Sequence, residues 1–282
     1  MQRDPGQSIE FGETTDGLDP SKMITPTPQT THAIETSGLT RRFGNLYAVD
    51  GLDLRVEVGT FYGFLGPNGA GKSTTMKMLT GLLAPTSGSI RIFDQPMADT
   101  DETRWMKRRM GVVPEDFALF DNLTAREYLT FIGRMYLLPL PTVRERCQQL
   151  LEMMSLENEE TKLTLEFSHG MKKKLALAAA LIADPDLLFL DEPFEGIDAV
   201  SSRVLRDILK RAVERGATVF LTSHILEIVE KLCTDVGIIA KGKLVHQASM
   251  DEIRQKGSLE DVFLKTVGSE QAEARKLSWL EE

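Results

Sequence analysis

The spacing of hydrophobic residues predicts strands in the first part of the chain, from Ile34 onward. Apolar and charged positions alternate there, with the period of a half-buried antiparallel strand, at Leu52, Leu54, Val56 and Val58. A continuous apolar run at 61–65, a glycine-rich segment at 66–71 and a helical run at 74–83 follow. The order of these elements is therefore strand, glycine-rich loop and helix.

Residues 121–183 have the spacing of amphipathic helices instead. The segment Thr124-Ala125-Arg126-Glu127 has the pattern of a capping box, which begins a helix. Two more helices are expected at 143–154 and 171–183. This part of the chain is predicted to be a mostly helical insert.

Strands resume after the helical insert. The runs 187–190 and 218–221 are almost entirely apolar, as expected for strands buried on both faces of a parallel sheet. A helix is predicted between them at 201–215, ending at Gly216. Residues 236–240 and 243–247 are joined around a glycine and predict a closing hairpin.

Composition and charge argue against several classes of protein. The 282 residues are 41% hydrophobic and 27% charged, as in ordinary globular proteins, and the formal net charge is −9. Nucleic acid is not expected as a partner, because phosphate backbones attract clustered Lys and Arg. No apolar run approaches the ~18 residues that a membrane helix needs. Residues 1–32 lack the basic start and apolar middle of a signal peptide.

The two cysteines, Cys147 and Cys233, have no metal-ligand spacing around them. They are expected to be small core residues of a protein in a reducing compartment. We therefore expect a cytoplasmic protein whose contact with a membrane comes through a partner.

The glycine-rich segment fits the pattern Gly-x-x-x-x-Gly-Lys-Ser at every fixed position. Its glycines let backbone N–H groups turn inward around an anion, and the following helix adds its positive end. Lys72 supplies a charge for the outer phosphates, and the hydroxyl of Ser73 is a ligand for Mg²⁺. The alternative is a simple turn before a helix, but a chance match has a probability of roughly 1 in 100. The predicted phosphate loop comprises Gly66, Pro67, Asn68, Gly69, Ala70, Gly71, Lys72, Ser73 and Thr74.

Two acids, Asp191 and Glu192, follow the apolar run 187–190, and His224 follows the next one. Ligands of an open α/β sheet bind at the carboxyl ends of its strands. Asp191 is therefore predicted to hold Mg²⁺, and Glu192 to act as the base for an attacking water. His224 is predicted to hydrogen-bond phosphate or that water; the alternative is a structural histidine.

From Ile34 to about Gly268 the chain resembles the nucleotide-binding subunit of ATP-binding-cassette (ABC) transporters. The likeness rests on motifs in a fixed order, and other phosphate-loop families lack the Ser-x-Gly element before the Asp-Glu strand. These motifs are Phe43-Gly44, the phosphate loop, Val112-Val113-Pro114-Glu115, Phe167-Ser168-His169-Gly170-Met171, Leu190-Asp191-Glu192-Pro193, Gly196-Ile197-Asp198 and His224.

The resemblance implies roles for further residues. Phe43 would stack on the adenine ring, and Val49 would also belong to the nucleotide site; the alternative for Phe43 is an ordinary core aromatic. Ser168 and Gly170 would contact the γ-phosphate of an ATP held by a second copy. Asp198 would cross the same interface of a head-to-tail dimer with two ATP molecules between its subunits.

The expected fold is α/β, a phosphate-loop NTPase core with a mainly parallel sheet, an N-terminal antiparallel β subdomain and an inserted helical subdomain. We expect the ATPase domain at 33–268, with the insert at about 116–185. Residues 1–32 contain too little apolar surface to offset their ordering entropy and are predicted to be a disordered tail. Residues 269–282 are predicted to be a short charged tail.

The chain departs from the family pattern at three places. Glu115 stands where the family usually has glutamine, and our hypothesis is that it still contacts Mg²⁺ and takes part in catalysis. At residues 167–171, which we call the signature segment, the family usually has Leu-Ser-Gly-Gly-Gln. Met171 stands at the position of the glutamine and donates no side-chain hydrogen bond. Residues 172–174 are three lysines in the first turn of a helix, where the dipole favours acids. They are expected to form a solvated basic face or to meet a partner's phosphate.

The predicted function is to bind and hydrolyse ATP as the energy-supplying subunit of a multi-subunit transporter, with export preferred over import. Its expected partners are a membrane-embedded permease and a second ATPase subunit, and its expected place is the cytoplasmic face of a membrane. Some apolar residues after Glu115 are candidates for a permease groove, although most are expected in the core: Phe117, Leu119, Phe120 and Tyr128. The alternative is a soluble ABC-type ATPase that acts as a switch or on nucleic acid or the ribosome.

Overall fold

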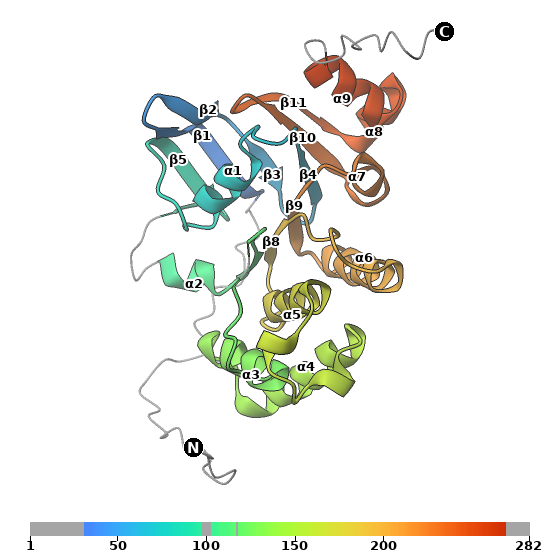
Figure 1. The fold of residues 1–282 in the computed structure, drawn as a ribbon. Helices are drawn as coiled ribbons and strands as arrows, with labels where there is room; N and C mark the ends of the chain where they lie inside the picture. Colours follow the sequence, from blue (N-terminus) through green and yellow to red (C-terminus); the bar gives the residue numbers. More distant parts are fainter. Residues whose placement is uncertain (1–30, 98–102, 117, 269–282) are drawn as a thin grey trace, which may run out of the picture.

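The computed structural model describes residues 31–97, 103–116 and 118–268, and the strands of this part form two sheets (Figure 1). The two predicted tails, except for residues 31 and 32, and the prediction for Phe117 lie outside the described residues. The first sheet is antiparallel, and its strands are hydrogen-bonded in the order β2 (Leu46–Leu52), β1 (His32–Phe43), β5 (Ser87–Ile92) and β6 (Gln95–Pro96). A further strand, β3 (Arg55–Glu57), also pairs with β1.

The second sheet contains the parallel strands. Its order in the described residues is β11 (Lys243–Ser249), β10 (Asp235–Ala240), β4 (Phe61–Leu65), β9 (Thr218–Ser223), β8 (Leu187–Asp191) and β7 (Met110–Val113). The strands from β10 to β7 run parallel, whereas β11 pairs antiparallel with β10. The predicted parallel core and closing hairpin are therefore confirmed.

Alternate residues of the parallel strands pack into two separate hydrophobic clusters. In β4, Phe61 and Leu65 pack on one face together with residues of the helices, and Tyr62 and Phe64 pack on the other face together with residues of the antiparallel sheet. Phe220 of β9 stacks on Tyr62, with ring centroids 5.6 Å apart. Close packing on both faces makes this sheet a rigid support for the loops that follow its strands.

Helices α3 (Ala125–Met135), α4 (Leu140–Met153) and α5 (His169–Leu181) gather at one end of the molecule (Figure 1). α8 (Met250–Lys256) and α9 (Leu259–Val267) lie at the other end. Among the described residues, no helix is long and apolar enough to cross a membrane. Other helical elements of the described residues are α1 (Lys72–Leu79), α2 (Arg104–Lys107), α6 (Ala199–Glu214), α7 (Leu226–Leu232) and the short 3₁₀ turns Glu157–Glu159 and Thr164–Glu166.

The ends of the helices follow local capping. The predicted capping box at the start of α3 is confirmed: Glu127 N donates to Thr124 Oγ1 at 3.2 Å, and Thr124 N donates to Glu127 Oε2 at 2.8 Å. Helices α1, α4, α5 and α6 begin two or three residues before their predicted starts. The apolar spacing does not mark these starts, and only α5 and α6 among them have a side-chain cap.

The single strand expected over 52–58 is instead broken. β2 ends at Leu52 and β3 begins at Arg55, and both pair with β1. The hydroxyl of Thr36 fills the break, donating to Leu52 O at 2.8 Å and accepting from Leu54 N at 2.9 Å. The predicted alternation of buried residues holds as far as Val56, but Val58 is 37% exposed.

Candidate functional site

The carboxyl ends of β4, β9, β8 and β7 lie side by side in the parallel sheet, and neighbouring strands end almost level in the register. The segments that follow them therefore start at one edge of the sheet. The glycine-rich loop follows β4, His224 follows β9, Glu192 follows β8 and Glu115 follows β7. Residues that are far apart in the sequence meet here because of this register.

The glycine-rich loop has no room for side chains at two of its glycines. A Cβ at Gly66 would lie 2.4 Å from the carbonyl oxygen of Ile239, and a Cβ at Gly71 would lie 2.4 Å from that of Ala48. Gly71 also has a φ of 112° and caps α1, so the loop turns directly into the helix at Lys72. A helix that begins in this way offers its first N–H groups and its positive end to an anion.

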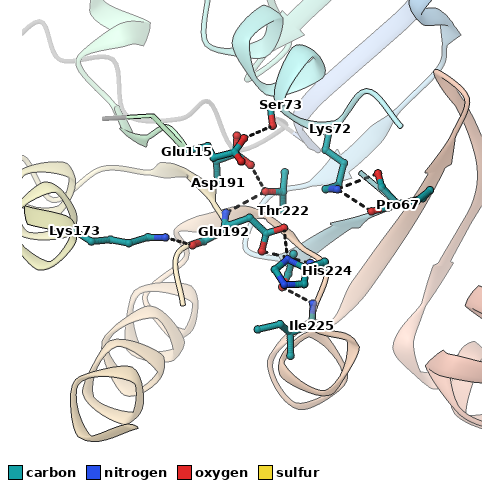
Figure 2. A network of polar contacts seen from close by, with 12 residues as sticks. Pro67, Lys72, Ser73, Glu115, Lys173, Asp191, Glu192, Thr222, His224 and Ile225 are labelled. Carbon is teal, nitrogen blue, oxygen red and sulfur yellow. Dashed lines mark hydrogen bonds and ion pairs between the residues drawn. The ribbon is translucent and has the colours of Figure 1, made fainter. Parts of the chain in front are cut away.

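Lys72 is buried, and its ammonium group lies against the loop (Figure 2). Nζ donates to the carbonyl oxygen of Gly66 at 2.7 Å and to that of Pro67 at 3.3 Å. These bonds hold the positive charge at the loop, where it can neutralise the outer phosphates of a nucleotide.

Ser73, Glu115 and Asp191 bring hard oxygen donors together (Figure 2). Ser73 Oγ donates to Glu115 Oε2 at 3.0 Å, and Thr222 Oγ1 donates to Asp191 Oδ1. Burial raises the pKa of Asp191, and hydrogen bonds from Thr222 and Ser73 partly lower it again. Such oxygens fit Mg²⁺. In the described residues no three His, Cys, Asp or Glu side chains form a metal site by themselves, so an ion here would also need phosphate or water oxygens.

Glu192 and His224 form the second polar pair of the site (Figure 2). His224 Nδ1 lies 3.0 Å from Glu192 Oε1, and His224 N donates to Glu192 Oε2 at 3.4 Å. Glu192 is 8% exposed and has a φ of 46°, in the left-handed region that side chains rarely adopt. Its carboxylate is therefore held by two groups of His224, one on each oxygen, and lines the cavity.

These groups line one cavity of about 880 Å³. One wall of the cavity was not predicted from the sequence; it is formed by Tyr47 of β2 and by Phe263, Leu264 and Val267 of α9. Two patterns could have indicated this wall: an aromatic residue near the first glycine turn, and apolar residues that recur on one side of the last helix. The cavity thus has a polar end at the phosphate loop and an apolar wall at α9.

Phe43 and Val49 do not line this cavity. Phe43 is 46% exposed, and the guanidinium of Arg41 lies 4.5 Å from its ring centre, so it is not a core residue. Val49 is fully buried, and its Cγ2 would lie 3.4 Å from a Cβ placed at Gly71. It therefore packs behind the phosphate loop.

Ser168, Gly170 and Asp198 also lie outside the cavity. Ser168 caps α5, and its Oγ accepts from Met171 N at 3.3 Å. Asp198 caps α6 and accepts from Ser201 N at 2.9 Å, and this bond and Lys174 hold its pKa well below the usual range. The structure therefore places these residues at two helix starts, away from the phosphate loop of their own chain.

The three lysines of α5 do not form a solvated face, which corrects that expectation. Lys172 lies 3.6 Å from a carboxylate oxygen of Asp121, and Lys174 lies 2.9 Å from one of Asp198. Lys173 is only 3% exposed, and its ammonium donates to the carbonyl oxygen of Glu192. Partners within the chain offset the unfavourable position of these three lysines near the start of the helix.

Comparisons with known proteins agree with this geometry. The profile of the family "ABC transporter" matches residues 49–195. The chain is 38% identical to the daunorubicin/doxorubicin resistance ATP-binding protein DrrA of Streptomyces peucetius, over 80% of this chain and 68% of that protein. It is 39% identical to the bacitracin transport ATP-binding protein BcrA of Bacillus licheniformis, over 79% of this chain and 72% of that protein.

A solved structure of an ATP-binding subunit of an ABC transporter has the same fold, with a TM-score of 0.78 and 29% identity over 83% of this chain and 99% of that one. A dimeric cassette bound to ADP and phosphate supports the fold alone, with a TM-score of 0.71 and 24% identity over 77% of this chain and 98% of that one. The chain belongs to the ATP-binding subunits of ABC transporters. It is an ATPase that hydrolyses ATP to power transport.

Replacing Asp191 with asparagine should stabilise the chain in the absence of nucleotide. The pKa of Asp191 is higher in the folded chain than in the unfolded chain, so protonation of this carboxyl stabilises the fold. That contribution is fully present below the unfolded-state pKa and is lost as the pH rises through the folded-state pKa. At pH 7.5, Asp191→Asn removes the buried charge and should raise the melting temperature by about 2 °C. This gain should shrink as the pH is lowered.

Thermal unfolding without ATP, followed by circular dichroism, measures this effect. Asp207→Asn, on the exposed side of α6, is the matched control and should leave the melting temperature unchanged. An Asp191→Asn variant that melts at or below the wild-type temperature would show that the charge of Asp191 carries no cost in the folded chain.

Proposed function

We propose that this chain supplies energy to an exporter and acts at the cytoplasmic face of a membrane on a separate permease. The observation that carries the proposal is the meeting of the phosphate loop, Asp191 and Glu192 at one edge of the parallel sheet. The similarity to DrrA and BcrA, which are named for drug resistance and bacitracin transport, supports export.

In the proposed reaction, water attacks the γ-phosphorus of ATP, the bond from that phosphorus to the bridging oxygen breaks, and ADP leaves. Glu192 accepts a proton from the attacking water, and His224, 3.0 Å from its carboxylate, holds the pair in position. Lys72 neutralises phosphate charge from the other side. Ser73, Asp191 and Glu115 would hold Mg²⁺, which would neutralise phosphate charge when bound.

The proposed catalytic unit is a head-to-tail dimer. Ser168, Gly170 and Asp198 lie outside the cavity of their own chain, at the starts of α5 and α6. The start of a helix is suited to an anion. A second copy could therefore place this segment on the γ-phosphate of the first, and each site would be complete only in the pair.

The helical region offers a surface for the permease. Phe120 is 51% exposed, and its ring meets that of Phe131 edge-on, with centroids 5.3 Å apart; Phe131 is itself 40% exposed. Among the earlier candidates, Tyr128 is buried and Leu119 packs against the core. We therefore assign the permease contact to Phe120 and Phe131, a short distance along the chain from Glu115.

Replacing Glu192 with glutamine should stop hydrolysis without stopping ATP binding. Loss of a general base lowers the rate by roughly 10²–10⁴-fold, so ATP-bound dimers should accumulate because their nucleotide is not consumed. Size-exclusion chromatography with light scattering, combined with phosphate release, measures both effects. Glu145→Gln, on the exposed side of α4, is the matched control. A Glu192→Gln chain that turns over at the normal rate and stays monomeric with MgATP would overturn the mechanism.

Truncating Leu264 should weaken binding of the nucleoside but not of the phosphates. We place the base of ATP on the apolar α9 wall, because Phe43 lies outside the cavity. Leu264 is 53% exposed on that wall, so Leu264→Ala should remove contact with the base without opening the core. The Kd for MgATP should rise about tenfold, which corresponds to ~1.4 kcal/mol, whereas the Kd for inorganic tripolyphosphate should not change. Titration calorimetry measures both, with Leu82→Ala, 66% exposed outside the cavity, as the control. Equal Kd values for MgATP in wild type and Leu264→Ala would place the base elsewhere.

Replacing Glu115 with glutamine should weaken the metal site. Glutamine keeps the length of the side chain and an acceptor for Ser73 Oγ, but it removes one negative charge. One charge at contact distance in water is worth about 1 kcal/mol, so the Mg²⁺ concentration for half-maximal activity should rise about fivefold. A magnesium titration of ATPase activity measures this. An unchanged midpoint would show that Glu115 does not contact the ion.

A further inference from the structure

Lys173 is a buried lysine that the reaction above does not use. It is the fifth residue of α5, and only 3% of its surface is exposed. Burial lowers the pKa of Lys173, and a group of carboxylates opposes that shift: Glu195, Glu192, Asp191 and Glu115. A lysine buried beside acids and bonded to a specific atom needs an explanation beyond packing.

That atom is the main-chain carbonyl oxygen of Glu192, to which Lys173 Nζ donates (Figure 2). The backbone of Glu192 has a φ of 46° and precedes Pro193, and both features are unfavourable for a residue with a side chain. Such a conformation persists only when surrounding groups hold it.

Two side chains from different elements bind the backbone of Glu192. Thr222 Oγ1 of β9 accepts from Glu192 N at 3.2 Å, and Lys173 of α5 binds the carbonyl oxygen on the other side. The direction of the Glu192 carboxylate toward His224 depends on this backbone. The same carbonyl oxygen also accepts from Glu195 N at 3.2 Å, but only the bond from Lys173 is charge-assisted, which makes it the stronger anchor.

The same helix begins at Ser168, five residues before Lys173. At a rise of 1.5 Å per residue, the two positions are about 7.5 Å apart along one rigid helix. If Ser168 contacts the ATP of a second subunit, as proposed above, any shift of α5 on that contact is transmitted to the backbone of Glu192. Lys173 thus connects the signature segment to the base of its own chain.

We propose that Lys173 is a positioning residue, which holds the backbone of Glu192 in its left-handed conformation and links the position of α5 to that of the catalytic carboxylate. The link to a second subunit rests on the proposed dimer, whereas the anchoring of Glu192 does not. Removing the ammonium should therefore affect the chemical step and leave ATP binding in place.

Lys173→Met tests this, because methionine fills the buried space and lacks the donor. We expect kcat to fall about 30-fold, with the Kd for MgATP within about twofold of wild type, since an interaction that acts only in the chemical step changes kcat alone. Lys210→Met, on the exposed side of α6, is the matched control and should keep kcat within about twofold.

A second variant separates positioning from packing. Lys173→Arg keeps a charged donor but fits the buried space less well than methionine. Positioning predicts that Lys173→Arg is more active than Lys173→Met, and packing alone predicts the reverse. If Lys173→Met loses its cooperative thermal transition, it is not folded, and the kcat of Lys173→Arg is compared with that of wild type instead. A kcat of Lys173→Arg that is 30-fold below wild type would then overturn the proposal.

The decisive measurement is single-turnover hydrolysis by the double variant Lys173→Met/Glu192→Gln. If Lys173 acts through the carboxylate of Glu192, its loss should lower the residual rate of Glu192→Gln by less than about twofold, because coupled residues are not additive. An equal fold-loss in both backgrounds would overturn the proposal. Normal hydrolysis by Glu192→Gln alone would instead refute the proposed mechanism.

Discussion

The register of the parallel strands is the constraint on which the rest of the site depends. Because β4, β9, β8 and β7 end nearly level, the phosphate loop, His224, Glu192 and Glu115 start from one edge of the sheet. Burial of the strands on both faces fixes that register, since a slip by one residue would exchange the two hydrophobic clusters. The geometry of the site is therefore supported by the core.

Two close contacts then set the position of the phosphate loop within this frame. Gly66 lies against the backbone of Ile239 and Gly71 against that of Ala48, so the loop is wedged between β10 and the antiparallel sheet. On the other side of the site, Lys173 connects α5 to the backbone of Glu192. The antiparallel sheet, the parallel core and the helical region thus all contact the residues of the site.

Much of this could be predicted from the sequence, because motifs with fixed spacing follow strands with clear apolar patterns. The fold class, the order of the elements and the capping box at Thr124 are confirmed. Local patterns did not predict contacts between distant segments: the Thr36 hydroxyl that bridges a broken strand, the burial of Lys173, and the α9 wall of the cavity. A lysine looks the same in the sequence whether it is solvated or bound to a carbonyl oxygen, because its partner is chosen by tertiary packing.

The central claim is that each complete site combines the phosphate loop of one chain with the signature segment of another. Complementation tests it most directly: a Lys72→Met chain and a Ser168→Arg chain, each inactive alone, are mixed and assayed for ATP hydrolysis. One site of every mixed dimer keeps both intact halves, so random pairing should restore roughly a quarter of wild-type activity. A mixture as inactive as its components, or full activity of Ser168→Arg alone, would contradict the account.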